Sequence, residues 1–85
     1  MRKVNLSKKA HAFLKKIPPK HARQIAQKLL QLQLNPIQPD IKKLQGRSED
    51  FFRVDSGEYR IIYRFNTELI EILLIGKRND GAVYQ

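Results

Sequence analysis

Residues 59–65 read Tyr-Arg-Ile-Ile-Tyr-Arg-Phe, and after Asn66-Thr67 residues 68–75 read Glu-Leu-Ile-Glu-Ile-Leu-Leu-Ile. Both runs are rich in β-branched and aromatic side chains, and turn residues separate them, which is the pattern of a β-hairpin. A third run over residues 51–54 precedes a second group of turn residues, Asp55 to Glu58. The second half of the chain therefore predicts a three-stranded antiparallel meander.

The turn between the last two runs predicts their register. If Asn66-Thr67 form a two-residue loop, three pairs of apolar-bodied residues share one face of the sheet, and we expect that face to pack on helices. The pairs are Tyr63 with Ile70, Ile61 with Ile72, and Tyr59 with Leu74. The other face is mixed and pairs Arg64 with Leu69, Ile62 with Glu71, and Arg60 with Leu73.

The turn between the first two runs places two arginines side by side. A two-residue loop at Ser56-Gly57, or a four-residue loop over 55–58, sets Arg53 opposite Arg60 on the face away from the helices. Like charges directly opposite each other destabilise a sheet by up to about 1 kcal/mol, so this pair is more reasonable where an anion binds between them. Two other interpretations stay open: the guanidinium groups splay into water, or Asp55 or Glu58 neutralises them.

The first half of the chain predicts two helices. After an extended start over residues 3–6, Ser7 is a plausible N-cap, and apolar residues then recur at helical spacing up to Pro18-Pro19. A second helix is expected over residues 20–34, ended by Asn35-Pro36. The two apolar stripes are Ala10, Phe13, Leu14 and Ile17, then Ala22, Ile25, Ala26, Leu29 and Leu32. We therefore expect an α+β fold in which an N-terminal helical hairpin packs on a twisted antiparallel sheet.

The 85 residues are enough for one small domain, spanning 1–85, and the chain has no cysteine. Its net charge of +9 points to a polyanionic partner such as nucleic acid. The whole excess of positive charge lies before Asp40, in a stretch that has nine basic residues and no acidic residue. The basic residues are Arg2, Lys3, Lys8, Lys9, Lys15, Lys16, Lys20, Arg23 and Lys28. With no apolar run long enough for a membrane span or a signal peptide, we expect a cytoplasmic protein without a membrane partner.

Several kinds of active site find no support in the sequence. His11 and His21 lie in separate helices without carboxylates at metal-ligand spacing, so no metal site and no cofactor are expected. What remains is a group of cations, Arg53 and Arg60 on the sheet and Lys77 and Arg78 after it, followed by Tyr84. Arginine suits bidentate contact with phosphate, and tyrosine offers a ring for an unstacked base, so the group favours single-stranded RNA.

The chain also resembles the RelE/ParE superfamily of toxins from bacterial type II toxin–antitoxin modules. The matching stretches are Lys42-Lys43-Leu44-Gln45-Gly46, Phe52-Arg53-Val54, Gly57 to Tyr63, Gly76-Lys77-Arg78 and Val83-Tyr84. Members of the RelE type enter the ribosomal A site and cleave mRNA without metal, by attack of a ribose 2′-hydroxyl on the adjacent phosphate. The tail, with Arg78 after the last strand and Tyr84 six residues later, looks like the RelE arrangement.

The resemblance implies a role for each matching residue. Arg60 would hold the scissile phosphate, Arg78 would lie by the leaving 5′-oxygen, and Tyr84 would stack on the attacked nucleotide. Arg53 stands where the RelE pattern has the first of two strand lysines, and Asp55 stands at or near the second. Further RNA contacts are expected from Lys42, Lys43, Arg47 and Lys77.

The departure at Arg53 and Asp55 leaves the general base open. Arginine, with a pKa above about 12, cannot give up its proton as a lysine can. Asp55 ranks first as the base, and the alternatives are Lys43, assistance by the ribosome, or an Asp55 that only begins the turn.

Three functions are therefore compatible with the sequence. The favoured one is a ribosome-dependent endoribonuclease that binds ribosomal RNA through the basic helical half and is neutralised by a cognate antitoxin. The others are a ParE-like inhibitor of DNA gyrase and a non-catalytic member that binds RNA or its antitoxin. An acidic, amphipathic antitoxin segment would suit the basic surface and four apolar side chains expected to face solvent: Phe51, Ile62, Leu69 and Leu73.

Overall fold

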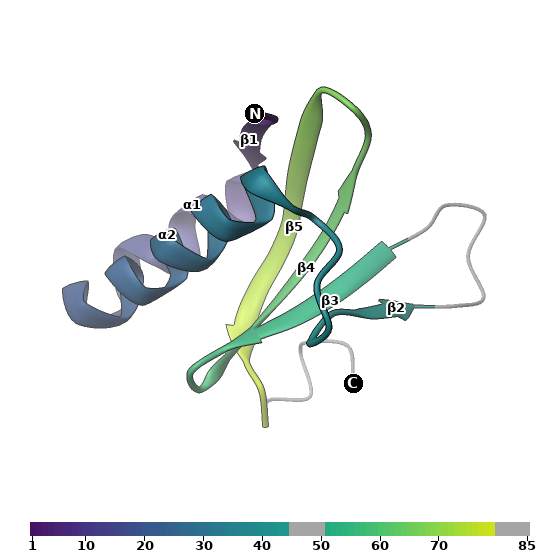
Figure 1. The fold of residues 1–85 in the computed structure, drawn as a ribbon. Helices are drawn as coiled ribbons and strands as arrows, with labels where there is room; N and C mark the ends of the chain where they lie inside the picture. The colour runs from purple at the N-terminus through teal and green to yellow at the C-terminus, as the bar shows by residue number, and fades with distance from the viewer. Residues whose placement is uncertain (45–50, 80–85) are drawn as a thin grey trace.

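Five strands form a single mixed sheet in the computed structural model, which describes residues 1–44 and 51–79 (Figure 1). In spatial order the strands are β1 (Lys3–Leu6), β5 (Leu69–Lys77), β4 (Tyr59–Phe65), β3 (Phe51–Ser56) and β2 (Lys42–Leu44). The three central strands are the predicted antiparallel meander. The expected α+β class is confirmed, but the sheet is not purely antiparallel, because β1 pairs parallel to β5.

Two helices, α1 (Lys8–Lys16) and α2 (Pro19–Leu34), lie on the same side of this sheet (Figure 1). Ser7 caps α1 as predicted: its Oγ accepts a hydrogen bond from the Ala10 N–H at 3.1 Å. The same hydroxyl donates to the carbonyl of Leu73 at 2.8 Å, which ties the start of α1 to β5. Among the described residues, neither helix has the length and apolar character that crossing a bilayer requires.

The core lies between the helices and one face of the sheet. Ile25, Leu29 and Leu32 of α2 are buried at the predicted spacing, but Ala26 is exposed. It lies one residue past Ile25, about 100° further round the helix, and so leaves the narrow stripe that contacts the sheet. The buried core cluster comprises Ala10, Ile25, Leu29, Leu32, Val54, Tyr59, Ile61, Tyr63, Ile70, Ile72 and Ile75.

The β3–β4 register differs from the prediction by two residues. Arg60 lies opposite Asp55, and Arg53 lies opposite Ile62, so the expected pair of facing arginines is wrong. The turn consists of Gly57 and Glu58, with Gly57 at a φ of 59°. Primed hairpin turns need this positive φ at their first central residue, where glycine has no steric penalty. A shift of two residues leaves each side chain on its expected face, because strand side chains alternate with period two.

The predicted register of β4 with β5 is wrong for two reasons. The connection spans residues 66–68, because the Asn66 Oδ1 accepts hydrogen bonds from the N–H groups of Glu68 (2.8 Å) and Leu69 (2.9 Å). A β-bulge then interrupts the pairing between Ile62 and Tyr63, whose partners are Leu74 and Ile72.

The bulge leaves Leu73 without a partner on β4 and moves Leu74 to the face away from the helices. The prediction that Leu74 packs in the core is therefore wrong, and Tyr59 lies opposite Lys77. The other observed pairs are Phe65 with Ile70, Arg64 with Glu71, Tyr63 with Ile72, Ile62 with Leu74, Ile61 with Ile75, and Arg60 with Gly76.

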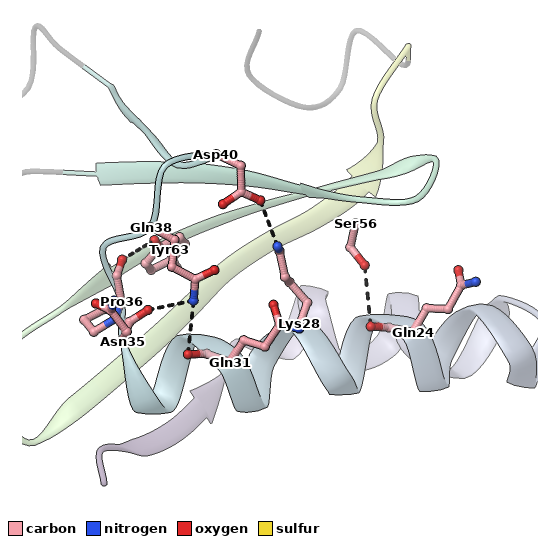
Figure 2. A network of polar contacts seen from close by, with 9 residues as sticks. All are labelled: Gln24, Lys28, Gln31, Asn35, Pro36, Gln38, Asp40, Ser56 and Tyr63. Carbon is pink, nitrogen blue, oxygen red and sulfur yellow. Dashed lines mark hydrogen bonds and ion pairs between the residues drawn. The ribbon is translucent and has the colours of Figure 1, made fainter.

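Polar contacts hold the segment between α2 and β2 against the sheet (Figure 2). The buried Tyr63 hydroxyl donates to the carbonyl of Pro36 at 2.7 Å. Lys28 of α2 donates to Asp40 at 2.8 Å, and its ammonium group holds the pKa of that carboxyl below the usual value. Burial, with the Asp40 charge as a lesser cause, raises the pKa of Tyr63, so this hydroxyl stays a donor at neutral pH. These contacts set where β2 begins.

Candidate functional site

Two arginines converge on the carboxylate of Asp55 on the sheet face away from the helices. The Arg60 Nε donates to Asp55 Oδ1 at 3.0 Å, and the Arg78 Nε lies 3.3 Å from Oδ2. The Arg60 side chain is 12% exposed, whereas that of Arg78 is 53% exposed. Of the two alternatives to an external anion, neutralisation by Asp55 is the arrangement observed.

The β3–β4 turn positions Arg78. Its backbone N–H donates to the Glu58 carbonyl at 2.9 Å, and its Nη1 donates to the Gly57 carbonyl at 3.4 Å. These two hydrogen bonds hold Arg78, the first residue after β5, against the turn that precedes β4. Arg60 needs no such anchor, because it lies within β4 opposite Asp55.

An open hollow of about 410 Å³ adjoins these arginines and is lined by Glu58, Arg60, Lys77, Arg78 and Asn79. Gly76 lies opposite Arg60 on β5, so the directly paired residue of that strand adds no side chain beside the guanidinium group. Among the described residues, three cations and one carboxylate line the hollow. Its size and charge suit a phosphate group with part of a nucleotide.

A second cationic pair lies further along the sheet. Lys42 of β2 is directly opposite Arg53 of β3, and both border a small pocket that Asp40 and Asp55 also line. Arg53 is two residues from Asp55 on the same strand and therefore on the same face. Asp55 thus lies between the Lys42 and Arg53 pair and the Arg60 and Arg78 pair.

One of the expected RNA contacts, Lys43, is not brought into this arrangement, and two of the predicted site residues cannot be placed. Lys43 lies opposite Phe52, so it is on the other face of the sheet from Arg53. Arg47 and Tyr84 lie outside the described residues. Glu58 and Asn79, by contrast, line the hollow without having been predicted to do so. A polar residue in the turn facing Arg78 was the available signal for Glu58, and no sequence pattern pointed to Asn79.

The N-terminus of α2 approaches the same turn through a histidine. The Nδ1 of His21 is 2.6 Å from the hydroxyl of Tyr59 and 3.7 Å from a carboxylate oxygen of Glu58. Burial, with the Glu58 charge as a further cause, raises the pKa of Tyr59. His21 therefore has a structural partner in the core, and within residues 1–44 and 51–79 no three potential metal-ligating side chains gather into one group.

The helices carry an uncompensated basic surface. Six exposed cations on α1 and α2 have no ion-pair partner in the described part of the chain: Lys8, Lys9, Lys15, Lys16, Lys20 and Arg23. Lys20 immediately precedes His21, whose Nδ1 lies 3.7 Å from Glu58 of the β3–β4 turn, so the basic surface and this turn meet at the start of α2.

The apolar side chains expected to face solvent are more buried than predicted. Ile62 is only 2% exposed, and Phe51, Leu69 and Leu73 are partly buried. Ile62 lies between Arg53 and Leu74 across the sheet, where the aliphatic part of an arginine can cover an apolar neighbour. Among residues 1–43 and 51–79, the large apolar side chains that are exposed lie elsewhere, at Met1, Leu30, Leu34 and Ile37.

Solved structures of toxins share this fold, whereas no curated protein sequence matches the chain. The archaeal RelE–RelB complex from Pyrococcus horikoshii is similar with a TM-score of 0.79 and 29% identity, over 94% of this chain and 98% of that chain. The RelBE2 toxin–antitoxin complex from Mycobacterium tuberculosis has a TM-score of 0.78 and 24% identity, over 91% and 98%. A mutant of the E. coli toxin RelE in the free state has a TM-score of 0.65 and 19% identity, over 95% and 87%.

The family model that matches is that of the ParE toxins, and it covers residues 4–81. The match runs from the first strand to beyond Arg60 and Arg78, which together form the arginine cluster. Together with the shared RelE-like fold, this match means that the chain belongs to the ParE toxin family of type II toxin–antitoxin systems.

Proposed function

We propose that this toxin is a ribosome-dependent endoribonuclease that cleaves mRNA in the A site and so inhibits translation. The observation that carries the proposal is the convergence of Arg60 and Arg78 on one carboxylate beside an open cationic hollow. Two guanidinium groups aimed at one pair of acceptor oxygens form an oxyanion-binding position.

In the proposed reaction Arg60 binds the scissile phosphate. Its side chain is largely buried and already oriented, so little reorganisation is needed when charge develops on the phosphate oxygens. Arg78, whose side chain is 53% exposed, is proposed to lie by the leaving 5′-oxygen. The 2′-hydroxyl gives its proton to a base, and its oxygen forms a bond to phosphorus as the bond from phosphorus to the 5′-oxygen breaks. The leaving 5′-oxygen takes up a proton, so the products are a 2′,3′-cyclic phosphate and a 5′-hydroxyl. Tyr84 is proposed to stack on the attacked nucleotide and hold the in-line geometry.

Flanking phosphates are proposed to bind along the same face of the sheet. Lys42 and Arg53 lie side by side next to the arginine cluster, and Lys77 lines the hollow. The six helical cations provide a separate surface for ribosomal RNA, whose binding falls steeply with salt because each phosphate contact releases counterions. Access to translating ribosomes implies a cytoplasmic location.

A cognate antitoxin is the proposed protein partner. The similar structures from P. horikoshii and M. tuberculosis are toxin–antitoxin complexes. An acidic segment with apolar anchors would complement the basic helices and the exposed Leu30 and Leu34 of α2.

Inhibition of DNA gyrase is the second candidate function, because the matching family model is that of ParE toxins. One experiment separates the two. The purified chain is added to a translating extract, mRNA ends are mapped by primer extension, and a gyrase supercoiling reaction runs in parallel.

Codon-phased cuts that depend on ribosomes are expected, with at least about a 100-fold loss in Arg60→Ala and Arg78→Ala. Arg64→Ala is the matched control, since Arg64 lies on the same strand and face but pairs with Glu71 at 2.9 Å. Intact mRNA together with inhibited supercoiling would replace the RNA-cleavage proposal by the gyrase one.

A further inference from the structure

The carboxylate of Asp55 lies between the two arginines that are proposed to bind phosphate, where a negatively charged side chain would compete with the RNA. Asp55 lies directly opposite Arg60, each of its oxygens faces a different guanidinium group, and its side chain is 40% exposed. We propose that Asp55 is an internal counter-anion that occupies the phosphate position between Arg60 and Arg78, so that RNA binds by displacing it. The inference rests on the function proposed above.

Carboxylates and phosphodiesters compete for the same donors. Each offers two acceptor oxygens to a guanidinium group. In the free toxin the Nε–H of Arg60 is already donated to Asp55 Oδ1 at 3.0 Å. Binding of phosphate is therefore an exchange of one anion for another, and its affinity is lower than two uncompensated arginines would give.

The charges lead to the same conclusion. Arg60 and Arg78 contribute two positive charges, and the single negative charge of Asp55 offsets one of them. Its carboxylate oxygens lie 3.0 Å from the Arg60 Nε and 3.3 Å from the Arg78 Nε. At such distances a charge acts strongly even where solvent partly screens it.

Asp55→Asn tests the inference with little change of shape, since the amide oxygen can still accept the Arg60 hydrogen bond. Glu71→Gln is the matched control. It makes the same change in net charge in another arginine–carboxylate pair between adjacent strands, Arg64 with Glu71 at 2.9 Å. The probe is a short, fully 2′-O-methylated RNA that cannot be cleaved, and its binding to the full chain is followed by fluorescence anisotropy over a range of salt concentrations.

Asp55→Asn is expected to bind the probe about tenfold more tightly, with a steeper salt dependence, and Glu71→Gln within about threefold of the wild type. The arginine Nε–H signals in NMR spectra should respond to inorganic sulfate at lower concentration in Asp55→Asn than in the wild type. Equal tightening in both variants would overturn the inference in favour of overall charge. Weaker binding in Asp55→Asn would show that Asp55 only holds the arginines, and unchanged binding with lost cleavage would make it the base.

These results separate the inference from the proposed function. If Asp55→Asn binds the probe more tightly but the wild type leaves mRNA intact in the extract, RNA cleavage fails and the counter-anion stands. If the wild type cleaves mRNA and Asp55→Asn binds no more tightly, the counter-anion alone fails.

Discussion

Tyr63→Phe should destabilise the toxin more than the loss of one exposed hydroxyl would. Tyr63 is fully buried, and its hydroxyl donates at 2.7 Å to the carbonyl of Pro36, a residue that is also buried. The substitution removes a hydrogen bond with a net value of about 1 kcal/mol and leaves a buried acceptor unsatisfied, at a cost of about 1–3 kcal/mol. We expect a total loss of about 2 kcal/mol in the free energy of unfolding.

Tyr59→Phe is the matched control. Tyr59 is equally buried, but the partner of its hydroxyl is His21, whose side chain is 31% exposed and can turn to water. Its loss should cost about 1 kcal/mol or less. Urea unfolding followed by far-UV circular dichroism measures both, and the midpoint should fall by about 1–2 M for Tyr63→Phe. A midpoint for Tyr63→Phe equal to or above that of Tyr59→Phe would refute the role assigned to the Pro36 contact.

Three further perturbations have expected outcomes. Gly57→Ala places a side chain at a φ of 59° and should cost about 1 kcal/mol or more in urea unfolding; an unchanged midpoint would contradict the turn assignment. Lys28 lowers the pKa of Asp40, so this pair stabilises the fold above the unfolded pKa near 3.8 and loses that contribution as the pH falls through the lower folded pKa. Since the Asp40 side chain is half-exposed, we expect the wild type to lose at most about 1 kcal/mol of unfolding free energy to this pair between pH 5 and pH 2. The loss should be absent in Asp40→Asn, and the same pH dependence of stability in wild type and variant would exclude a contribution of the pair. Replacing Lys15 and Lys16 together by Gln should reduce the slope of log affinity for ribosomes against log salt by about 1.5 units, and an unchanged slope would remove α1 from the rRNA surface.

The elements of the fold could be predicted from the sequence because each carries its own local pattern. The change of hydrophobic period from helical spacing to strand alternation separates α2 from β4, and Ser7 marks the start of α1 through a contact with Ala10 only three residues away. The faces of β3 and β4 were predictable for the same reason, because alternation survives a register error of two residues, whereas the bulge in β5 reversed the expected face of Leu74.

The exact pairing could not be predicted, because it depends on turn geometry and on long-range contacts. Gly57 fixes the β3–β4 register through its backbone conformation, and the bulge that turns Leu74 out of the core has no sequence pattern of its own. The parallel pairing of β1 with β5 joins residues that no local signal connects.

In the site, too, the residue types could be predicted from the sequence, but their contacts could not. Arg60 and Arg78 were predictable as residue types that bind phosphate, and so was the face of Arg60. That both contact Asp55 follows from the register of β3 with β4 and from the anchoring of Arg78 to the Gly57 and Glu58 carbonyls. One two-residue shift thus turned an expected pair of arginines into an arginine–carboxylate pair.

The parallel pairing of β1 also has a consequence for how the site forms. β1 pairs with β5, and Ser7 contacts Leu73, 66 positions along the chain. Contacts of such high sequence separation slow folding, because a long loop must close before they form. Arg78 is held in place only where the β3–β4 turn has formed. Arg60 and Arg78 therefore come together only after most of the sheet has assembled, so partly folded chains lack the complete site.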